Sequence, residues 1–269
     1  MDERRTAYSL IAPGSPGSGA SLRLPDRGFP RVDDHLVEPE VTRDEIIGGR
    51  RVVASPAQPS YATLHSRLNY VLCAHVAHGY LAASDLCTRF DEESDFAIDT
   101  CLFRDGVDPA TDARYLEEIA FAIVWERNEA VVEEKILRMC RRGVRRIFSI
   151  VVKDRQVREW LPDMQSWRSL DSDSRIEDRC FLEPLPVSAL LDPAAADDAV
   201  AGTLIAKENK RRAVKAKAED ILAVLEARGL AVSEPQRQEI LRCQDLDRLG
   251  RWLRRAALAA TAGEVTSDT

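Results

Sequence analysis

A continuous apolar run, IAFAIVW at residues 119–125, is the feature that most limits how this chain folds. Its length is typical of a strand, but it lacks the alternation of a strand that has one face in water. A strand of this kind is covered on both faces. We therefore expect a sheet with helices packed on each side of it.

Two segments predict the covering helices. Residues 60–81 carry apolar side chains at helical spacing and stop at Gly79, and residues 129–144 repeat the pattern and stop at Gly143. Residues 42–47, before a Gly-Gly pair, predict a short helix or turn. Short apolar segments predict strands at residues 50–55, 95–103, 119–125, 146–154 and 156–162. This order indicates an α/β or α+β fold with a mixed sheet flanked by helices.

The chain divides into four parts by pattern. Residues 1–41 are rich in Pro, Gly and Ser without periodicity and predict a flexible segment. Residues 42–193 hold the strand and helix patterns. Residues 194–262 predict a helical C-terminal appendage, which includes a Ser-x-x-Gln capping box that begins at Ser233. Residues 263–269 predict a disordered tail.

Composition excludes several classes of protein. The 38 Lys and Arg against 45 Asp and Glu give a net charge of −7, which disfavours a general nucleic-acid coat. Six cysteines lie far apart without a C-x-x-C pair, so neither a zinc cage nor a disulfide scaffold is expected. With no signal peptide and no run near the roughly 18 apolar residues of a membrane span, we expect a cytoplasmic protein without a membrane partner.

Five sequence pieces follow one another within residues 42–192: DEIIGGRRVVASP, a helix that carries His65, IDTCLF, EEIAFAIVW and EEKILRMCRRGVRRIFSIVV. In this order and spacing they resemble the Uma-type restriction endonucleases of bacteria, members of the PD-(D/E)XK nuclease superfamily. The resemblance implies a restriction-endonuclease-like core and metal-dependent cleavage of DNA, with Mg²⁺ as cofactor. The helical C-terminal part resembles a region seen on other nuclease-like bacterial proteins.

The resemblance also implies a set of catalytic residues. It places Asp99 on the family's first metal ligand, Lys135 on the lysine of the following helix, and Glu45 as a supporting carboxylate. Phosphodiester hydrolysis needs hard oxygen ligands for a divalent cation, and a lysine orients or deprotonates the attacking water. Each of the three is also compatible with an ordinary structural role, as a turn, surface or capping residue.

The sequence departs from the family at the second metal ligand. Aligned on the apolar strand, the family's glutamate falls on Ala122, whose methyl group cannot bind a cation. Glu134, next to Lys135 on the helix, is the best substitute, because a neighbouring helix can aim a carboxylate inward. The expected metal ligands are therefore Asp99 and Glu134.

Two groups of basic residues are candidates for contacts with DNA phosphates. They are Arg141 and Arg142 at a helix end, and Lys210, Arg211 and Arg212 in the C-terminal part. Residues 203–258 carry 13 basic and 8 acidic residues, an excess of +5. Such an excess fits DNA binding, and it equally fits a solvated helix face or a protein partner.

Two functions remain open from the sequence. The first is a metal-dependent DNA endonuclease, either active or catalytically degenerate. The alternative is a non-catalytic nuclease-fold module for binding or assembly, which acts as a homodimer or on a protein partner through residues 203–258.

Overall fold

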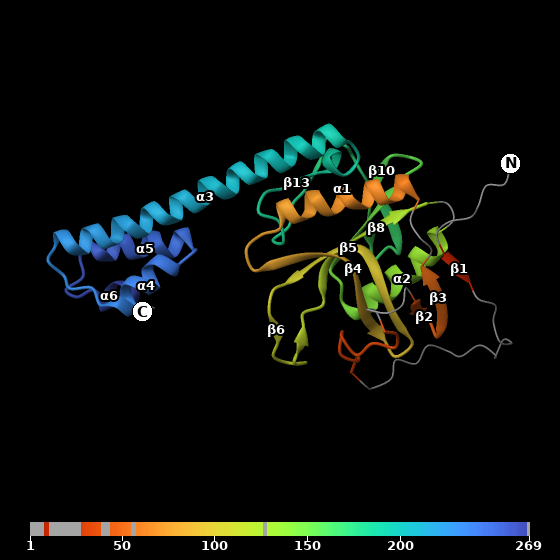
Figure 1. Ribbon diagram of the computed structural model, residues 1–269, viewed down its shortest axis with the longest axis horizontal. Helices are drawn as coiled ribbons and strands as arrows, with labels where there is room; N and C mark the ends of the chain where they lie inside the picture. Colours follow the sequence, from red (N-terminus) through yellow and green to blue (C-terminus); the bar gives the residue numbers. More distant parts are fainter. Residues whose placement is uncertain (1–7, 11–27, 39–43, 55–57, 126–127, 268–269) are drawn as a thin grey trace. The chain divides into compact units, whose positions relative to one another are not determined.

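The computed structural model describes residues 8–10, 28–38, 44–54, 58–125 and 128–267 (Figure 1). The chain divides into two compact units, Met1–Ala201 and Gly202–Thr269. The first unit contains a mixed sheet flanked by helices, and the second is helical in its described part. The α/β fold with a mixed sheet is as predicted.

Nine described strands form the main sheet, in the order β1-β3-β2-β5-β8-β9-β10-β11, with β4 paired to β5 off this path. Strands β8 and β9 are parallel, and the other described pairs of this sheet are antiparallel. The strands are β1 (Tyr8–Leu10), β2 (Asp44–Ile47), β3 (Arg50–Ala54), β4 (Tyr80–Asp91), β5 (Ser94–Arg104), β8 (Glu117–Val124), β9 (Arg146–Val151), β10 (Gln156–Leu161) and β11 (Ser166–Leu170). Two-residue strands pair separately: β6 (Val107–Asp108) with β7 (Ala113–Arg114), and β12 (Arg175–Ile176) with β13 (Leu185–Pro186).

Two helices cover opposite faces of this sheet (Figure 1). Helix α1 (Pro59–His75) packs on one face and α2 (Glu129–Arg142) on the other. Strand β8 lies between them and alternates its side chains. Ile119, Phe121 and Ile123 join the core of the α1 face, and Ala120, Ala122 and Val124 join the core of the α2 face. The prediction of a strand covered on both sides is confirmed.

The segment before the Gly-Gly pair is a strand, and the expected short helix or turn is wrong. Strand β2 pairs antiparallel with β3, with Ile47 opposite Arg50, and the two glycines form the loop between them. Both glycines have positive φ, 57° and 72°. This backbone suits a two-residue hairpin turn, because its twist matches that of the flanking strands. Glu45 and Ile47 of β2 are buried, which is the period-2 pattern of a strand.

The described parts of the N-terminal segment are folded, so the expected flexibility does not hold for them. Strand β1 pairs with β3. Val32 is buried, and its carbonyl oxygen accepts a hydrogen bond from the backbone N–H of Arg89. Tertiary pairing supplies here the order that the local sequence lacks. Most of residues 1–41 lie outside the described residues.

The C-terminal unit is built on helices. They are α3 (Pro193–Ala227), which begins in the first unit, α4 (Glu234–Arg242), α5 (Leu246–Ala256) and α6 (Gly263–Thr266). The capping box predicted at Ser233 is present, with the Gln236 side chain accepting from the Ser233 backbone N–H. Val265 of α6 is buried in the core of this unit, so the expected disorder of residues 263–269 is wrong for 263–267. No helix in the described part of the chain combines the length and apolarity that a membrane crossing needs.

Candidate functional site

Asp99 of β5 holds both of its carboxylate oxygens against protein donors. Oδ1 accepts a hydrogen bond from the Tyr61 hydroxyl of α1, and Oδ2 accepts one from the backbone N–H of Ile123 at 2.7 Å. Burial raises the pKa of Asp99, although these hydrogen bonds and the charges of His65 and Lys135 act against the rise.

The Ile123 contact lies where β5 and β8 stop pairing. Their backbone ladder reaches Thr100 opposite Phe121, and the next pair in this register is Asp99 and Ala122. Ala122 is fully buried in the core of the α2 face. Continued by one residue, the register thus brings the Asp99 backbone beside Ala122, the position at which the family resemblance implies a carboxylate, and the Ala122 methyl group packs into the α2 face.

A second carboxylate approaches Asp99 from its other neighbour, β4. In the β4–β5 register, Ser84 pairs with Thr100 and Leu86 with Ile98, so Asp85 lies directly across from Asp99. Asp85 has a φ of 52°, a left-handed conformation that few residues other than Gly, Asn and Asp adopt.

The apolar side chains of the hairpin change face at this point. Ala83 and Leu86 both contact the core of the α2 face, although residues three apart on a regular strand point to opposite faces. Ile98 and Cys101 on β5 show the same change. The hairpin is kinked at Asp85, and the kink sets the Asp85 carboxylate beside that of Asp99.

His65 completes this group from α1. Its Nε2 lies 2.5 Å from the backbone carbonyl oxygen of Asp99, to which it donates, and 3.9 Å from Asp85 Oδ1. One ligand atom from each of His65, Asp85 and Asp99 lies within 4.8 Å of the other two. Tyr61 stands one helical turn before His65, so α1 presents both side chains to Asp99. We call His65, Asp85 and Asp99 the His65 cluster.

The structure brings together two of the residues singled out from sequence, Glu45 and Lys135. Lys135 Nζ lies 2.9 Å from Glu45 Oε1 and 2.8 Å from Oε2, and both side chains are buried. Lys135 also donates to the carbonyl oxygen of Ala97, and Glu45 Oε1 accepts from the N–H of Ala97. The pair thus occupies the α2 face of β5, while Tyr61 and His65 reach Asp99 from the α1 face.

Glu134 lies elsewhere. It pairs with Arg50 and, at 3.3 Å, with Arg138. Neighbouring helix residues point about 100° apart, so Glu134 turns aside when Lys135 points at the sheet. The structure does not bring Glu134 to Asp99 as a shared pair of ligands.

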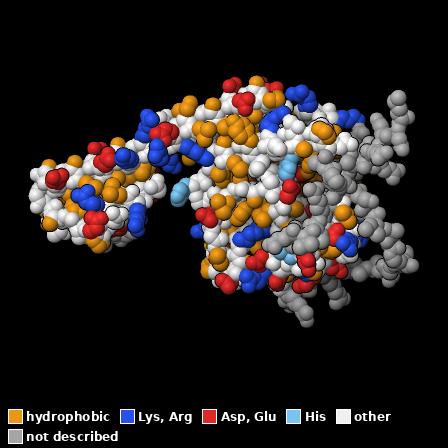
Figure 2. All heavy atoms as spheres, in the orientation of Figure 1, with side chains coloured by type: hydrophobic (Ala, Val, Ile, Leu, Met, Phe, Trp, Pro, Cys, Tyr) orange, Lys and Arg blue, Asp and Glu red, His pale blue; other side chains and the backbone are white. Residues whose placement is uncertain are grey.

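Three of the candidate DNA-contacting residues already have partners within the protein. Arg142 donates to the carbonyl oxygen of Pro30 at 2.5 Å and stacks on the Phe29 ring, whereas Arg141 is exposed. In the C-terminal unit, Arg211 and Arg212 both pair with Glu208, and Lys210 is exposed beside them. Figure 2 shows Lys and Arg side chains along α3 interspersed with acidic ones.

Sequence reasoning missed Tyr61 and Asp85. The spacing of Tyr61 and His65, four residues apart on a predicted helix, is a signal that could have linked these two. Asp85 carries no such signal, because only the β4–β5 register and the positive φ place it across from Asp99.

No protein-family profile and no curated protein matches the chain. Among solved structures, it is similar to a protein from Anabaena variabilis described as "a putative nuclease belonging to DUF820". The two chains are 15% identical, and the similarity covers 55% of this chain and 89% of that chain with a TM-score of 0.45.

Proposed function

We propose that this protein is a divalent-cation-dependent phosphodiesterase that cleaves DNA, with His65, Asp85 and Asp99 as the cation ligands. The observation that carries the proposal is the convergence of these three groups within 4.8 Å. Asp85 takes the place of the carboxylate that Ala122 lacks. The second carboxylate would thus come from β4, on one edge of β5, and not from β8, on the other edge.

The donor set fits a cation of this kind once the His65 proton, which Nε2 now donates to the Asp99 carbonyl oxygen, moves to Nδ1 and leaves Nε2 to coordinate. Two carboxylates are hard ligands of Mg²⁺ and Mn²⁺, and a single imidazole favours Mn²⁺ over Mg²⁺. The Asp85 side chain is 71% exposed, so the cluster is open to a phosphate from solvent. A bound divalent cation would activate water and stabilise the charge that develops on the phosphate.

Four other groups support the ligands. The Tyr61 hydroxyl and the Ile123 N–H hold the Asp99 carboxylate in one orientation. Lys135 lies on the other face of β5, and its positive charge favours the ionised form of Asp99. We assign Lys135 and Glu45 positioning roles, since they bind the backbone of Ala97, two residues before Asp99.

Exposed basic residues would hold the DNA backbone. Arg141, Lys210, Arg211 and Arg212 are exposed, whereas Arg142 is half-buried. Each neutralised phosphate releases counterions, so their contribution appears in the salt dependence of binding. Replacing Lys210, Arg211 and Arg212 together by alanine should make the negative slope of log K against log[salt], where K is the association constant for DNA, shallower by about 3.

The test is nicking of a supercoiled plasmid by the full chain with Mn²⁺ or Mg²⁺. We expect nicking that is faster with Mn²⁺ and at least about 100-fold slower in Asp85→Asn and in Asp99→Asn. Asp154→Asn, in the exposed turn between β9 and β10, is the matched control and should cut like wild type. Nicking that persists in both cluster variants would overturn the site, and its absence from the wild type would overturn the activity.

One observation favours a second candidate, a non-catalytic binding or assembly module. Both oxygens of Asp99 already accept hydrogen bonds from the protein, and Glu45 and Lys135 neutralise each other. On this alternative Mn²⁺ would not raise the melting temperature, because a ligand stabilises a protein only by binding its folded state.

A further inference from the structure

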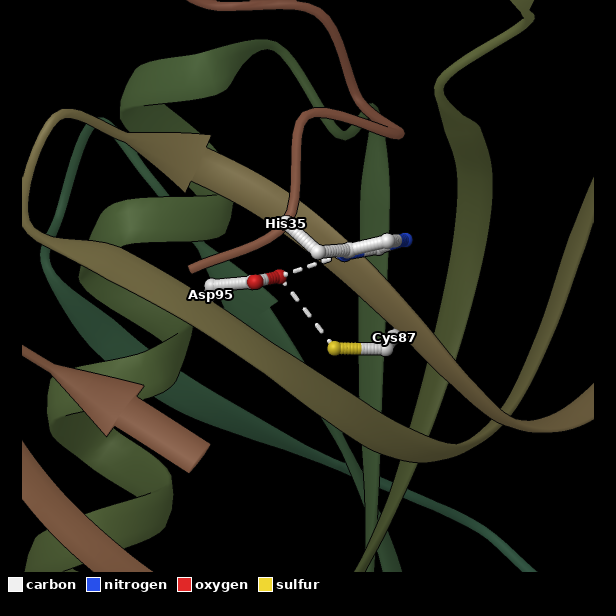
Figure 3. Close-up of side chains that lie close together, drawn as sticks. All are labelled: His35, Cys87 and Asp95. Carbon is white, nitrogen blue, oxygen red and sulfur yellow. Dashed lines mark hydrogen bonds and ion pairs between the residues drawn. The ribbon is translucent and has the colours of Figure 1, made fainter. Parts of the chain in front are cut away.

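A second cluster of ligand-type side chains lies on the β4–β5 hairpin, apart from the residues of the His65 cluster. Asp95 of β5 is fully buried, and its Oδ1 lies 3.0 Å from His35 Nδ1 and 3.2 Å from Cys87 Sγ. Figure 3 shows the imidazole and the thiol both directed at this carboxylate. Ligand atoms of the three residues lie within 4.8 Å of one another.

The three residues come from three separate segments. Asp95 is the second residue of β5, Cys87 lies on β4, and His35 belongs to the described N-terminal segment 28–38. The other oxygen of Asp95, Oδ2, accepts a hydrogen bond from the backbone N–H of Leu36 at 2.5 Å. The carboxylate therefore already holds this segment against the hairpin, and it fixes the position of His35.

The chemistry of the set is that of a zinc ligand set. Thiolate, imidazole and carboxylate bind Zn²⁺ at about 2.0–2.3 Å, which sets neighbouring ligand atoms of a tetrahedral site about 3.3–3.8 Å apart. The 3.0 and 3.2 Å separations here are within a few tenths of an ångström of that range. Small movements of three side chains would thus accommodate the ion.

The surroundings also suit an ion. The side chain of His35 is 25% exposed, so the cluster is reached from solvent, while that of Asp95 is fully buried. Three protein ligands leave a fourth position for water or another ligand. The cation would replace two protons that now point at Asp95: the thiol proton of Cys87 would be released to solvent, and the Nδ1 proton of His35 would move to Nε2.

We propose that His35, Cys87 and Asp95 form a binding site for a thiophilic divalent cation of the Zn²⁺ class, which ties segment 28–38 to the β4–β5 hairpin. The site is independent of the proposed phosphodiesterase, whose ligands are other residues and whose cations are harder.

The test uses the metal-free full chain and Co²⁺, whose thiolate complexes show a sulfur-to-cobalt charge-transfer band. We expect one equivalent of Co²⁺ to produce this band and Zn²⁺ to abolish it by displacement. Cys87→Ser should remove the band. Cys73→Ser, at an exposed thiol on α1, should retain it and serves as the matched control.

His35→Gln serves as a second variant, because His35 is at the surface and its replacement leaves the core intact. It should weaken Co²⁺ binding at least about tenfold, with an unchanged circular dichroism spectrum. Asp85→Asn, in the His65 cluster, should leave the band unchanged. A band that survives Cys87→Ser, or no band at all with stoichiometric Co²⁺, would overturn the proposal whether or not the chain cuts DNA.

Discussion

The Lys135 ammonium and the Glu45 carboxylate lie 2.8 Å apart inside the protein, and together they bind both polar backbone groups of Ala97. Lys135 donates to the carbonyl oxygen of Ala97, and Glu45 accepts from the N–H of Ala97. Strand β2 pairs with β5 only at Ile46 and Asp95 in the described ladder, so beyond that point these side chains take over the role of a neighbouring strand.

Removing one member of this pair should destabilise the fold strongly. Lys135→Met leaves the Glu45 carboxylate buried without a counter-charge and should cost about 3–5 kcal/mol in the free energy of unfolding. The double variant Lys135→Met/Glu45→Gln removes the stranded charge and should recover part of the loss. Urea unfolding monitored by circular dichroism measures both. A single variant within 1 kcal/mol of wild type would contradict the structural role.

The glycines of the β2–β3 turn should differ in their tolerance of alanine. Both have positive φ, so either substitution should cost about 1 kcal/mol in backbone strain. A Cβ on Gly49 meets nothing within 4 Å, whereas one on Gly48 overlaps the Arg138 guanidinium that pairs with Glu134. We expect Gly48→Ala to lower the melting temperature more than Gly49→Ala. Equal losses would show that the turn does not pack on Arg138.

Asp178 should make stability depend on pH in the acid range. Burial acts to raise its pKa, but hydrogen bonds from Arg145, the backbone of Cys180 and Arg146 outweigh burial and lower the pKa. A carboxylate whose pKa is lower in the folded than in the unfolded protein stabilises the fold at pH values above its unfolded-state pKa, near 4. This stabilisation is lost as the pH falls towards the pKa of the folded state.

Asp178→Asn should therefore cost about 2 kcal/mol at pH 7, and the difference from wild type should shrink below about pH 4. Denaturant unfolding at pH 7, 5 and 3 measures the change, with Asp154→Asn as the exposed control. A difference that stays constant down to pH 3 would argue against the ion pairs as its cause.

Trp252 should matter for the C-terminal unit alone. It is 2% exposed and packs in one cluster with Ile221 and Leu225. Trp252→Ala should cost about 3–5 kcal/mol through the cavity it leaves. Hydrogen exchange should speed up in α4 and α5 and stay unchanged in β8. Leu258→Ala, at an 85% exposed side chain, should leave exchange as it is in wild type.

The sequence by itself determined the elements whose pattern is local. The apolar run at residues 119–125 specified a strand between two helical layers. Gly143 specified the end of α2, where it adopts the left-handed conformation, and Ser233 specified the start of α4. These features depend on periodicity and capping within a few residues, so physical chemistry makes them readable along the chain.

The tertiary structure alone decided which side chains meet. Asp85 faces Asp99, and His35 reaches Asp95, through strand register and a kink that no local pattern encodes. A slip of one residue would turn every side chain of a strand to the other face. Sequence therefore identified Asp99, Glu45 and Lys135 as candidates, but only the fold determined that Lys135 binds Glu45 and that Asp99 lies with Asp85 and His65.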